Sequence, residues 1–182
     1  MKTLIFGFAL VASAASASFA QPATVILVRH AEKASEPASD PPLTAVGQQR
    51  AKDLAHALAD AKVSTIITTQ FARTKETAKP LVDSLHQTLI VVATGAMKEH
   101  IEEVAAKVKG AKKGSTVLVV GHSNTIPAII GALGGPKMPD LCDAEYSNLF
   151  VLEMSESGQA RLIRGHFGAA DPPDAASCRV IR

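Results

Sequence analysis

The chain has 182 residues, a formal net charge of +2 and a mean hydropathy of +0.16. Because positive and negative side chains nearly balance, there is no overall field to draw the protein to nucleic acid or to an anionic membrane. Tryptophan is absent and Tyr146 is the only tyrosine, which argues against a stacking surface for single-stranded nucleic acid. Any selectivity for an anion must therefore come from a local cluster of side chains.

The first 20 residues are typical of an export signal. The start is positive, an apolar run follows over residues 4–12, and Ser18 and Ala20 are the small residues that a signal peptidase reads. The apolar run is too short to serve comfortably as a membrane anchor. We therefore expect residues 1–20 to be a signal peptide, and residues 21–182 to form one catalytic domain that is periplasmic or secreted, with no membrane anchor once the signal is removed.

Strands and helices alternate along most of the remaining chain. Short apolar runs predict strands, and apolar residues spaced by three and four predict helices. In chain order, the predicted elements are a strand at 24–28, a helix with Thr44 as its N-cap, a strand at 63–68, a helix at about 72–85, a strand at 89–92, a helix through 101–108, a strand at 116–120, a helix that ends at 134–136, and a hairpin of strands at 149–154 and 160–164. This order predicts an α/β fold, a three-layer α/β/α sandwich with a mostly parallel central sheet.

Three of the predicted strands end near cationic or imidazole side chains. Arg29 and His30 follow the first strand directly, Arg73 follows the second, and His122 follows the fourth. The carboxyl ends of parallel strands share one edge of a sheet, where open α/β sheets bind ligands. Arginine pairs bidentately with phosphate oxygens, and a helix N-terminus favours anions. The sequence therefore predicts a phosphate pocket at this edge.

Neighbouring residues of a regular strand face opposite ways. Arg29 and His30 can therefore share that pocket only if the strand ends or twists between them. This is a direct structural requirement of the hypothesis.

The same residues lie in segments that resemble the histidine phosphatase superfamily, whose fold is phosphoglycerate-mutase-like. The resemblance follows the order of elements over essentially the whole domain, in what would be an exported, bacterial-type member. Ala31 and Thr69 depart from the Gly and Ser that the family usually has. The segments that carry the resemblance are Arg29-His30-Ala-Glu32-Lys33, Asp40-Pro-Pro-Leu43-Thr44-Ala-Val-Gly47-Gln48-Gln49, Thr69-Gln-Phe-Ala-Arg73-Thr-Lys-Glu-Thr77-Ala78 and Gly121-His122-Ser123-Asn124.

The resemblance implies a metal-independent phosphomonoester hydrolase without a cofactor. His30 would attack phosphorus to form a phosphohistidine, which water then hydrolyses. The three non-bridging oxygens would be held by Arg29, Arg73 and His122. Ser123 and Asn124 are assigned to substrate binding. The substrate would be a small phosphorylated molecule or a phosphorylated envelope component, and neither nucleic acid nor a metal ion is expected.

The general acid is the open role in this scheme. Glu99 precedes a predicted helix roughly where many family members place theirs, although the residues around it match the family poorly. A residue favoured by the helix dipole is an equally good interpretation of Glu99, and Glu32 and Glu145 are other candidates. No role is assigned to the remaining histidines, which are His56, His86, His100 and His166.

Two alternatives to a phosphatase stay open on the sequence. The segment around Ser123 resembles the nucleophile elbow of a serine hydrolase, with Asp140 or Asp143 and then His166 following in the right order. Against this, Thr125 replaces a glycine of the motif, and the cluster of arginines would have no use. The other alternative is a phosphate- or phosphoglycan-binding module with weak or no turnover.

The two cysteines, Cys142 and Cys178, are expected to pair as a structural disulfide. Thiols of an exported protein usually pair, since its compartment is oxidising.

Overall fold

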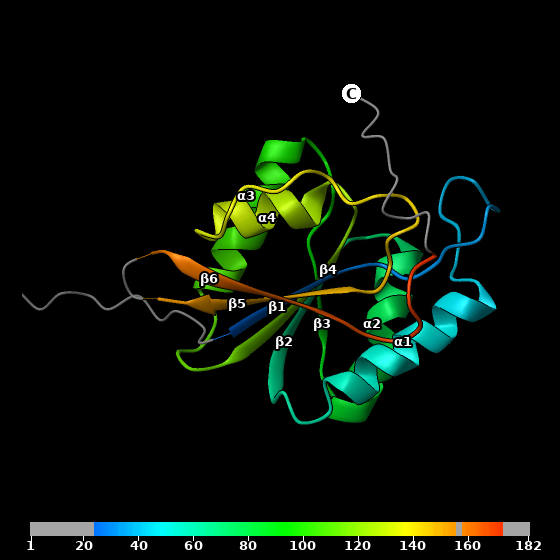
Figure 1. Ribbon diagram of the computed structural model, residues 1–182, viewed down its shortest axis with the longest axis horizontal. Coiled ribbons are helices and arrows are strands. Elements are labelled where there is room, and N and C mark those ends of the chain that lie inside the picture. The colour runs from blue at the N-terminus through cyan, green and yellow to red at the C-terminus, as the bar shows by residue number, and fades with distance from the viewer. Residues whose placement is uncertain (1–23, 156–157, 173–182) are drawn as a thin grey trace, which may run out of the picture.

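The computed structural model describes residues 24–155 and 158–172, and within them six strands form one sheet flanked by four helices (Figure 1). The predicted alternation of elements is confirmed, with boundaries that shift by one or two residues at several ends. The predicted signal peptide lies outside the described residues. In chain order the elements are β1 (Thr24–Arg29), α1 (Ala45–Ala57), β2 (Val63–Thr68), α2 (Ala72–Leu85), β3 (Leu89–Val91), α3 (Met97–Lys109), β4 (Thr116–Gly121), α4 (Thr125–Ala132), β5 (Asn148–Met154) and β6 (Ala160–His166).

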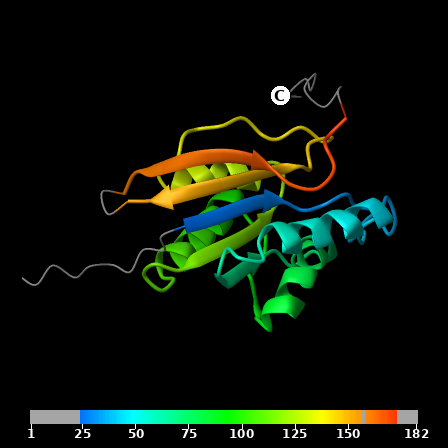
Figure 2. The same cartoon turned by 60° about the horizontal axis from the view of Figure 1, so that its bottom comes forward.

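The sheet has the strand order β3-β2-β4-β1-β5-β6. The strands β1 to β4 run parallel, whereas β5 pairs antiparallel with both β1 and β6. Figure 2 shows this antiparallel pair continuing the sheet beyond β1. The prediction of a mostly parallel sheet with a terminal hairpin is therefore confirmed.

Both faces of the central strands are buried, which explains their uninterrupted apolar sequences. Val25 and Leu27 of β1 belong to the core under α3 and α4. Ile26 and Val28, the alternate residues, belong to the core under α1 and α2. The four helices thus cover the sheet in pairs, one pair on each face (Figure 1).

The register of β1 against β4 brings the ends of the two strands level. Arg29 is paired with Gly121, and the backbone N–H of His30 donates to the carbonyl oxygen of Gly121 at 2.9 Å. His30 therefore emerges beside His122, the residue after Gly121. Two residues that are 92 positions apart in the sequence are brought together by a single backbone pairing.

The first helix packs closely on the segment that follows His30. Thr44 caps α1 as predicted, since its side chain accepts a hydrogen bond from the N–H of Gly47 at 3.1 Å. The backbone N–H of Thr44 donates to the carbonyl oxygen of Glu32 at 2.9 Å. A Cβ at Gly47 would overlap that same oxygen, so this approach requires glycine.

Within the described part of the chain, no helix is long and apolar enough to cross a membrane. Cys178 lies outside the described residues, so its pairing with Cys142 stays a prediction.

Candidate active site

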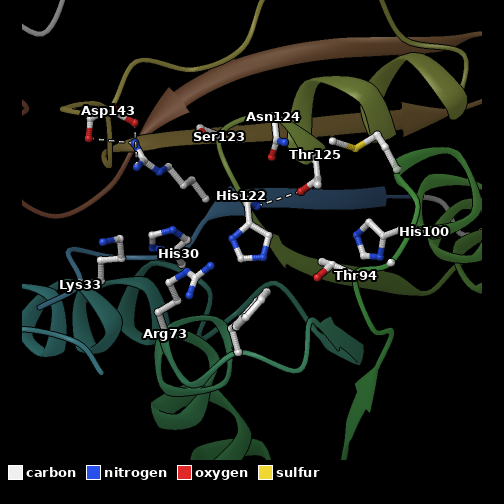
Figure 3. A pocket seen from close by; sticks show the side chains of 14 residues that line it. His30, Lys33, Arg73, Thr94, His100, His122, Ser123, Asn124, Thr125 and Asp143 are labelled. Atoms are coloured by element: carbon white, nitrogen blue, oxygen red, sulfur yellow. Dashed lines mark hydrogen bonds and ion pairs between the residues drawn. The ribbon is translucent and has the colours of Figure 1, made fainter. Parts of the chain in front are cut away.

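A pocket of about 400 Å³ opens at the carboxyl ends of the parallel strands (Figure 3). All four residues predicted to act on phosphate line it, and they come from three places in the chain. They are Arg29 and His30 at the end of β1, Arg73 in the first turn of α2, and His122 between β4 and α4. The predicted convergence on one edge of the sheet is therefore what the structure contains.

His30 is held as a neutral imidazole. Strand β1 ends at Arg29, so the break that the hypothesis required is present. The Nδ1 atom of His30 lies 2.8 Å from the carbonyl oxygen of Ala31. A carbonyl only accepts hydrogen bonds, so Nδ1 carries the proton and Nε2 keeps its lone pair. Burial lowers the pKa of His30 from 6.5 to about 3, opposed by the bond to Ala31 and reinforced by the charge of Arg29.

The acceptor of that proton is itself fixed by α2. The N–H of Ala31 donates to Thr77 Oγ1 at 2.9 Å, and Thr77 donates in turn to the carbonyl oxygen of Arg73 at 2.7 Å. The ring of His30 and the helix that carries Arg73 are thus tied together by two hydrogen bonds. Their relative position is set before any ligand arrives.

Arg29 is oriented by the loop that follows α4. Its Nη1 donates to the carbonyl oxygens of Cys142, Asp143 and Glu145 at 2.7, 3.0 and 3.2 Å. Its guanidinium stacks on Tyr146, with 4.3 Å between Cζ and the ring centroid. The Asp143 carboxylate is 3.8 Å from Nη2 but fully exposed, so solvent screens this pair strongly. The Nε atom is buried and has no hydrogen-bond partner within the described residues.

Arg73 enters the pocket from the first turn of α2. Its guanidinium stacks on Phe71 at 4.2 Å, and its Nη1 is 3.9 Å from the Asp40 carboxylate. The same carboxylate accepts a hydrogen bond from the N–H of Ala72 at 2.8 Å, so Asp40 also satisfies the N-terminus of α2. Burial lowers the pKa of Arg73, and Asp40 partly offsets this. Its Nε atom is likewise buried without a partner in the described chain.

His122 is held by a chain of hydroxyl groups. Its Nε2 lies 3.2 Å from Thr69 Oγ1, which lies 2.9 Å from Thr74 Oγ1. Burial, and next the charge of Arg73, lower the pKa of His122 from 6.5 to about 4. A neutral imidazole has one N–H. Thr74 has one hydroxyl proton, which can go to Thr69 Oγ1 or to the carbonyl oxygen of Phe71 at 2.9 Å. In the first arrangement Thr69 donates to Nε2 of His122, and the ring proton is on Nδ1, where a ligand can accept it.

Ser123 and Asn124 also line the pocket, at the entrance to α4. Ser123 is half-buried and Asn124 is exposed. The neighbouring Thr125 accepts a hydrogen bond from the N–H of His122 at 2.9 Å, which fixes the turn between β4 and α4. Ser123 and Asn124 therefore share the pocket with His30, within which a bound ligand could contact them.

The three carboxylates proposed as general acid are not in position for that role. Glu99 is exposed and is not among the residues that line the pocket, because the next residue, His100, takes the inward face of α3. Glu145 accepts a hydrogen bond from the N–H of Cys142 at 2.8 Å and so closes its own loop. Glu32 forms a 2.7 Å ion pair with the buried Arg50.

Several residues of the site carry no strong signal in the sequence. Asp40, Phe71 and Tyr146 act through contacts between loops, which no local spacing reveals. His100 is different, because it lies four residues before Val104 and eight before Val108 on the buried face of α3. Helical spacing alone could have predicted its burial.

The catalytic triad of a serine hydrolase is not assembled in the described residues. His166 directs Nδ1 to Ser147 Oγ at 3.0 Å, and Ser147 donates to Asp171 at 2.7 Å. These contacts tie the segment after β6 to the start of β5. Ser123 has no hydrogen bond to a histidine in this part of the chain.

Among the described residues, no three or more His, Cys, Asp or Glu side chains cluster so that they could hold a metal ion.

The model of the histidine phosphatase superfamily (branch 1) matches residues 25–100. This segment runs from β1 into the start of α3, so it contains His30 and Arg73 but ends before His122. A search of the curated proteins finds no match.

Solved structures share the fold of the chain at low sequence identity. The protein histidine phosphatase SixA, complexed with tungstate, has a TM-score of 0.62 and 19% identity over 79% of this chain and 96% of that chain. The alpha-ribazole phosphatase from Shigella flexneri has a TM-score of 0.63 and 13% identity over 81% of this chain and 100% of that chain. Bacillus stearothermophilus YhfR has a TM-score of 0.61 and 16% identity over 76% of this chain and 94% of that chain. At these identities the structures establish the fold.

Proposed function

We propose that the chain, whose residues 25–100 match the model of the histidine phosphatase superfamily and whose fold is similar to that of SixA, is an exported phosphomonoester hydrolase that acts through a phosphohistidine on His30 and requires no metal ion. Family and fold support phosphatase activity in general. The chemical course, the location and the metal independence are supported by separate observations on this chain.

The observation that carries the proposal is a pair of unsatisfied cationic donors beside a neutral imidazole. The Nε atoms of Arg29 and Arg73 are buried without partners among the described residues, although both arginines line the pocket with His30. Buried donors without partners are rare in folded proteins, since each costs about 1–3 kcal/mol. An anion that accepts from both would satisfy them, and a phosphoryl group has the oxygens to do so.

The first half of the reaction follows from the state of His30. Its Nε2 lone pair attacks phosphorus in line with the leaving oxygen, so the bond from nitrogen to phosphorus forms as the bond from phosphorus to oxygen breaks. Negative charge in the transition state spreads over three non-bridging oxygens. The cationic groups Arg29 and Arg73 are placed to stabilise it, and they also provide the neutralisation for which other phosphatases use a metal ion.

The second half regenerates the enzyme. Water attacks phosphorus from the side that the leaving group has vacated, the phosphorus–nitrogen bond breaks, and His30 recovers its lone pair. His122 is proposed to donate from Nδ1, in the tautomer for which Thr69 donates to its Nε2. No group other than water is consumed.

The substrate is proposed to be a small phosphorylated molecule or a phosphorylated component of the cell envelope. A pocket of about 400 Å³ can enclose a phosphoryl group and a modest part of what it is attached to. Ser123 and Asn124, at the rim, are proposed to contact that part.

The proposal can be tested with one aryl phosphate and one aryl ester. We expect the protein from residue 21 onward to hydrolyse the phosphate in the presence of a chelator, to be inhibited by vanadate, and to lose activity in His30→Asn. His56→Asn, which changes an exposed histidine on α1, is the matched control and should be fully active. Ester hydrolysis that is lost in Ser123→Ala would contradict the proposal.

The same experiment separates the enzyme from a binding module. A binding module would gain thermal stability with vanadate or phosphate, because a ligand that binds only the folded state raises the melting temperature. It would nevertheless leave the aryl phosphate unchanged. Stabilisation without turnover would therefore favour the binding module over the enzyme.

Export is proposed from the sequence of residues 1–20, and the disulfide between Cys142 and Cys178 from the oxidising compartment that export implies. Mass spectrometry of the protein purified from its natural compartment tests both. We expect an N-terminus after Ala20 and a mass that increases by two hydrogens on reduction. An intact N-terminus or two free thiols would contradict the proposal.

A further inference from the structure

The proposed reaction lacks an obvious proton donor for the leaving group. When His30 attacks in line, the leaving oxygen departs on the opposite side of phosphorus and must be protonated unless it is already a stable anion. Among the described residues that line the pocket, Asp143 is the only carboxylate, and it lies beside Arg29. Glu99 is exposed and outside the pocket. A different group must supply the proton.

His100 lines this pocket and its ring nitrogens are unequally satisfied. The residue is 4% exposed. Its Nδ1 lies 3.2 Å from the carbonyl oxygen of Ala93, so Nδ1 carries a proton. Its Nε2 is buried and has no hydrogen-bond partner in the described chain. In Figure 3, His100 and Thr94 lie beyond His122 as seen from His30, on the side of the pocket formed by the segment between β3 and α3.

The side chains around His100 come from the sheet and from α4 as well as from the pocket. An internal void beside His100 is lined by side chains that do not titrate, among them Thr68 from β2, Thr69 directly after it, Val119 and Val120 from β4, and Ile129 from α4. The titratable groups that line the same pocket as His100 are Arg29, His30, Lys33, Arg73, His122 and Asp143, and the charge of His100 contributes to the low pKa of His122.

We propose that His100 is the proton donor to the leaving group and occupies the role that the sequence suggested for Glu99. The inference rests on the proposed phosphatase function. As Nε2 of His30 bonds to phosphorus, the Nε2–H of the His100 imidazolium transfers its proton to the departing oxygen, and the product leaves as an alcohol. The attacking water then gives a proton to Nε2 of His100 while its oxygen bonds to phosphorus. Both histidines are returned to their starting states.

The test uses two substrates that differ in their need for a proton donor. p-Nitrophenyl phosphate releases a stable anion, whereas β-glycerophosphate releases an alkoxide that must be protonated. In His100→Asn the side-chain amide can still donate to the Ala93 carbonyl, but it has no proton to transfer. We expect kcat/KM for β-glycerophosphate to fall about 10²-fold or more, and kcat/KM for p-nitrophenyl phosphate to fall less than about threefold.

The control and the contradicting results separate this inference from the proposed function. His56→Asn should leave both substrates unchanged. Equal losses on both substrates, or no loss on β-glycerophosphate, would overturn the role of His100 while His30→Asn remained inactive. Full activity in His30→Asn would instead overturn the proposed function and this inference with it. If His100→Asn melts well below the wild type, His100→Gln is measured in its place and must show the same dependence on the leaving group.

Discussion

Replacing Thr69 by Val removes one hydroxyl group from the site and leaves the shape of the side chain nearly unchanged. Thr69 lies 3.2 Å from Nε2 of His122 and links it to Thr74. With the hydroxyl present, the single proton of the neutral His122 ring can be held on Nδ1, where it is available to a phosphoryl oxygen. Without the Thr69 hydroxyl, Nε2 of His122 has no donor to accept from. The ring can then carry its proton on Nε2, where it is not available to the phosphoryl oxygen.

The size of the effect is bounded from both sides. A neutral hydrogen bond contributes about 1 kcal/mol net, and about 1.4 kcal/mol corresponds to a factor of ten in rate, so the lost bond alone lowers kcat/KM about fivefold. Complete loss of one donor to the transition state costs about 10² to 10³-fold. Because His122 remains in place in Thr69→Val, we expect a fall in kcat/KM of about 10 to 100-fold, between these limits.

The assay is kcat/KM for p-nitrophenyl phosphate, together with the inhibition constant for vanadate. Thr69→Ser keeps the hydroxyl and is the matched control, so its kcat/KM should stay within about threefold of the wild type. The reasoning is refuted if Thr69→Val retains wild-type kcat/KM, or if Thr69→Ser falls as far as Thr69→Val.

Three further predictions concern stability and the phosphate clamp. The pKa of His30 is about 3 in the folded protein against 6.5 in the unfolded chain, so the unfolded state binds more protons between these values and the free energy of unfolding falls as the pH is lowered from 6.5. Urea unfolding at pH 7 and pH 4.5 should show this fall in the free energy of unfolding, and the fall should be smaller in His30→Asn. The same fall in His30→Asn and in the wild type would contradict the low pKa of His30. Gly47→Ala should lower the free energy of unfolding by about 1–3 kcal/mol because the added Cβ overlaps the backbone of Glu32. Gly131→Ala, where the added Cβ meets open space, should not destabilise the protein. Similar urea midpoints for the two variants would contradict this prediction. Arg73→Lys should lower kcat/KM about 10²-fold and the exposed Arg161→Lys should not, and equal activities would show that the guanidinium fork is not needed.

The framework of the site was predictable because it depends on backbone pairing of apolar strands. The runs at 24–28 and 116–120 are apolar on both faces, which predicts buried parallel strands, and the polar residues after them predict the edge that binds the ligand. The predicted break after Arg29 follows from the alternation of strand side chains. These inferences use only short-range patterns.

The partners of the site residues were not predictable, because they come from distant loops. The carbonyl groups that hold Arg29 lie more than 110 residues further along the chain. Glu32 was left as a possible acid, although it pairs with Arg50, since no local pattern shows which cation it meets. The choice between Glu99 and His100 depends on the phase of α3, where a rotation of one residue exchanges the exposed face for the buried one.

Trapping the phosphorylated enzyme tests the central claim most directly. The protein is mixed with excess p-nitrophenyl phosphate, quenched within milliseconds in base, where a phosphohistidine survives, and digested for mass spectrometry. The account predicts a phosphoryl group on His30 that is lost on exposure to acid and is absent in His30→Asn. A phosphoryl group on Ser123 or another residue, or turnover without any phosphorylated intermediate, would contradict it.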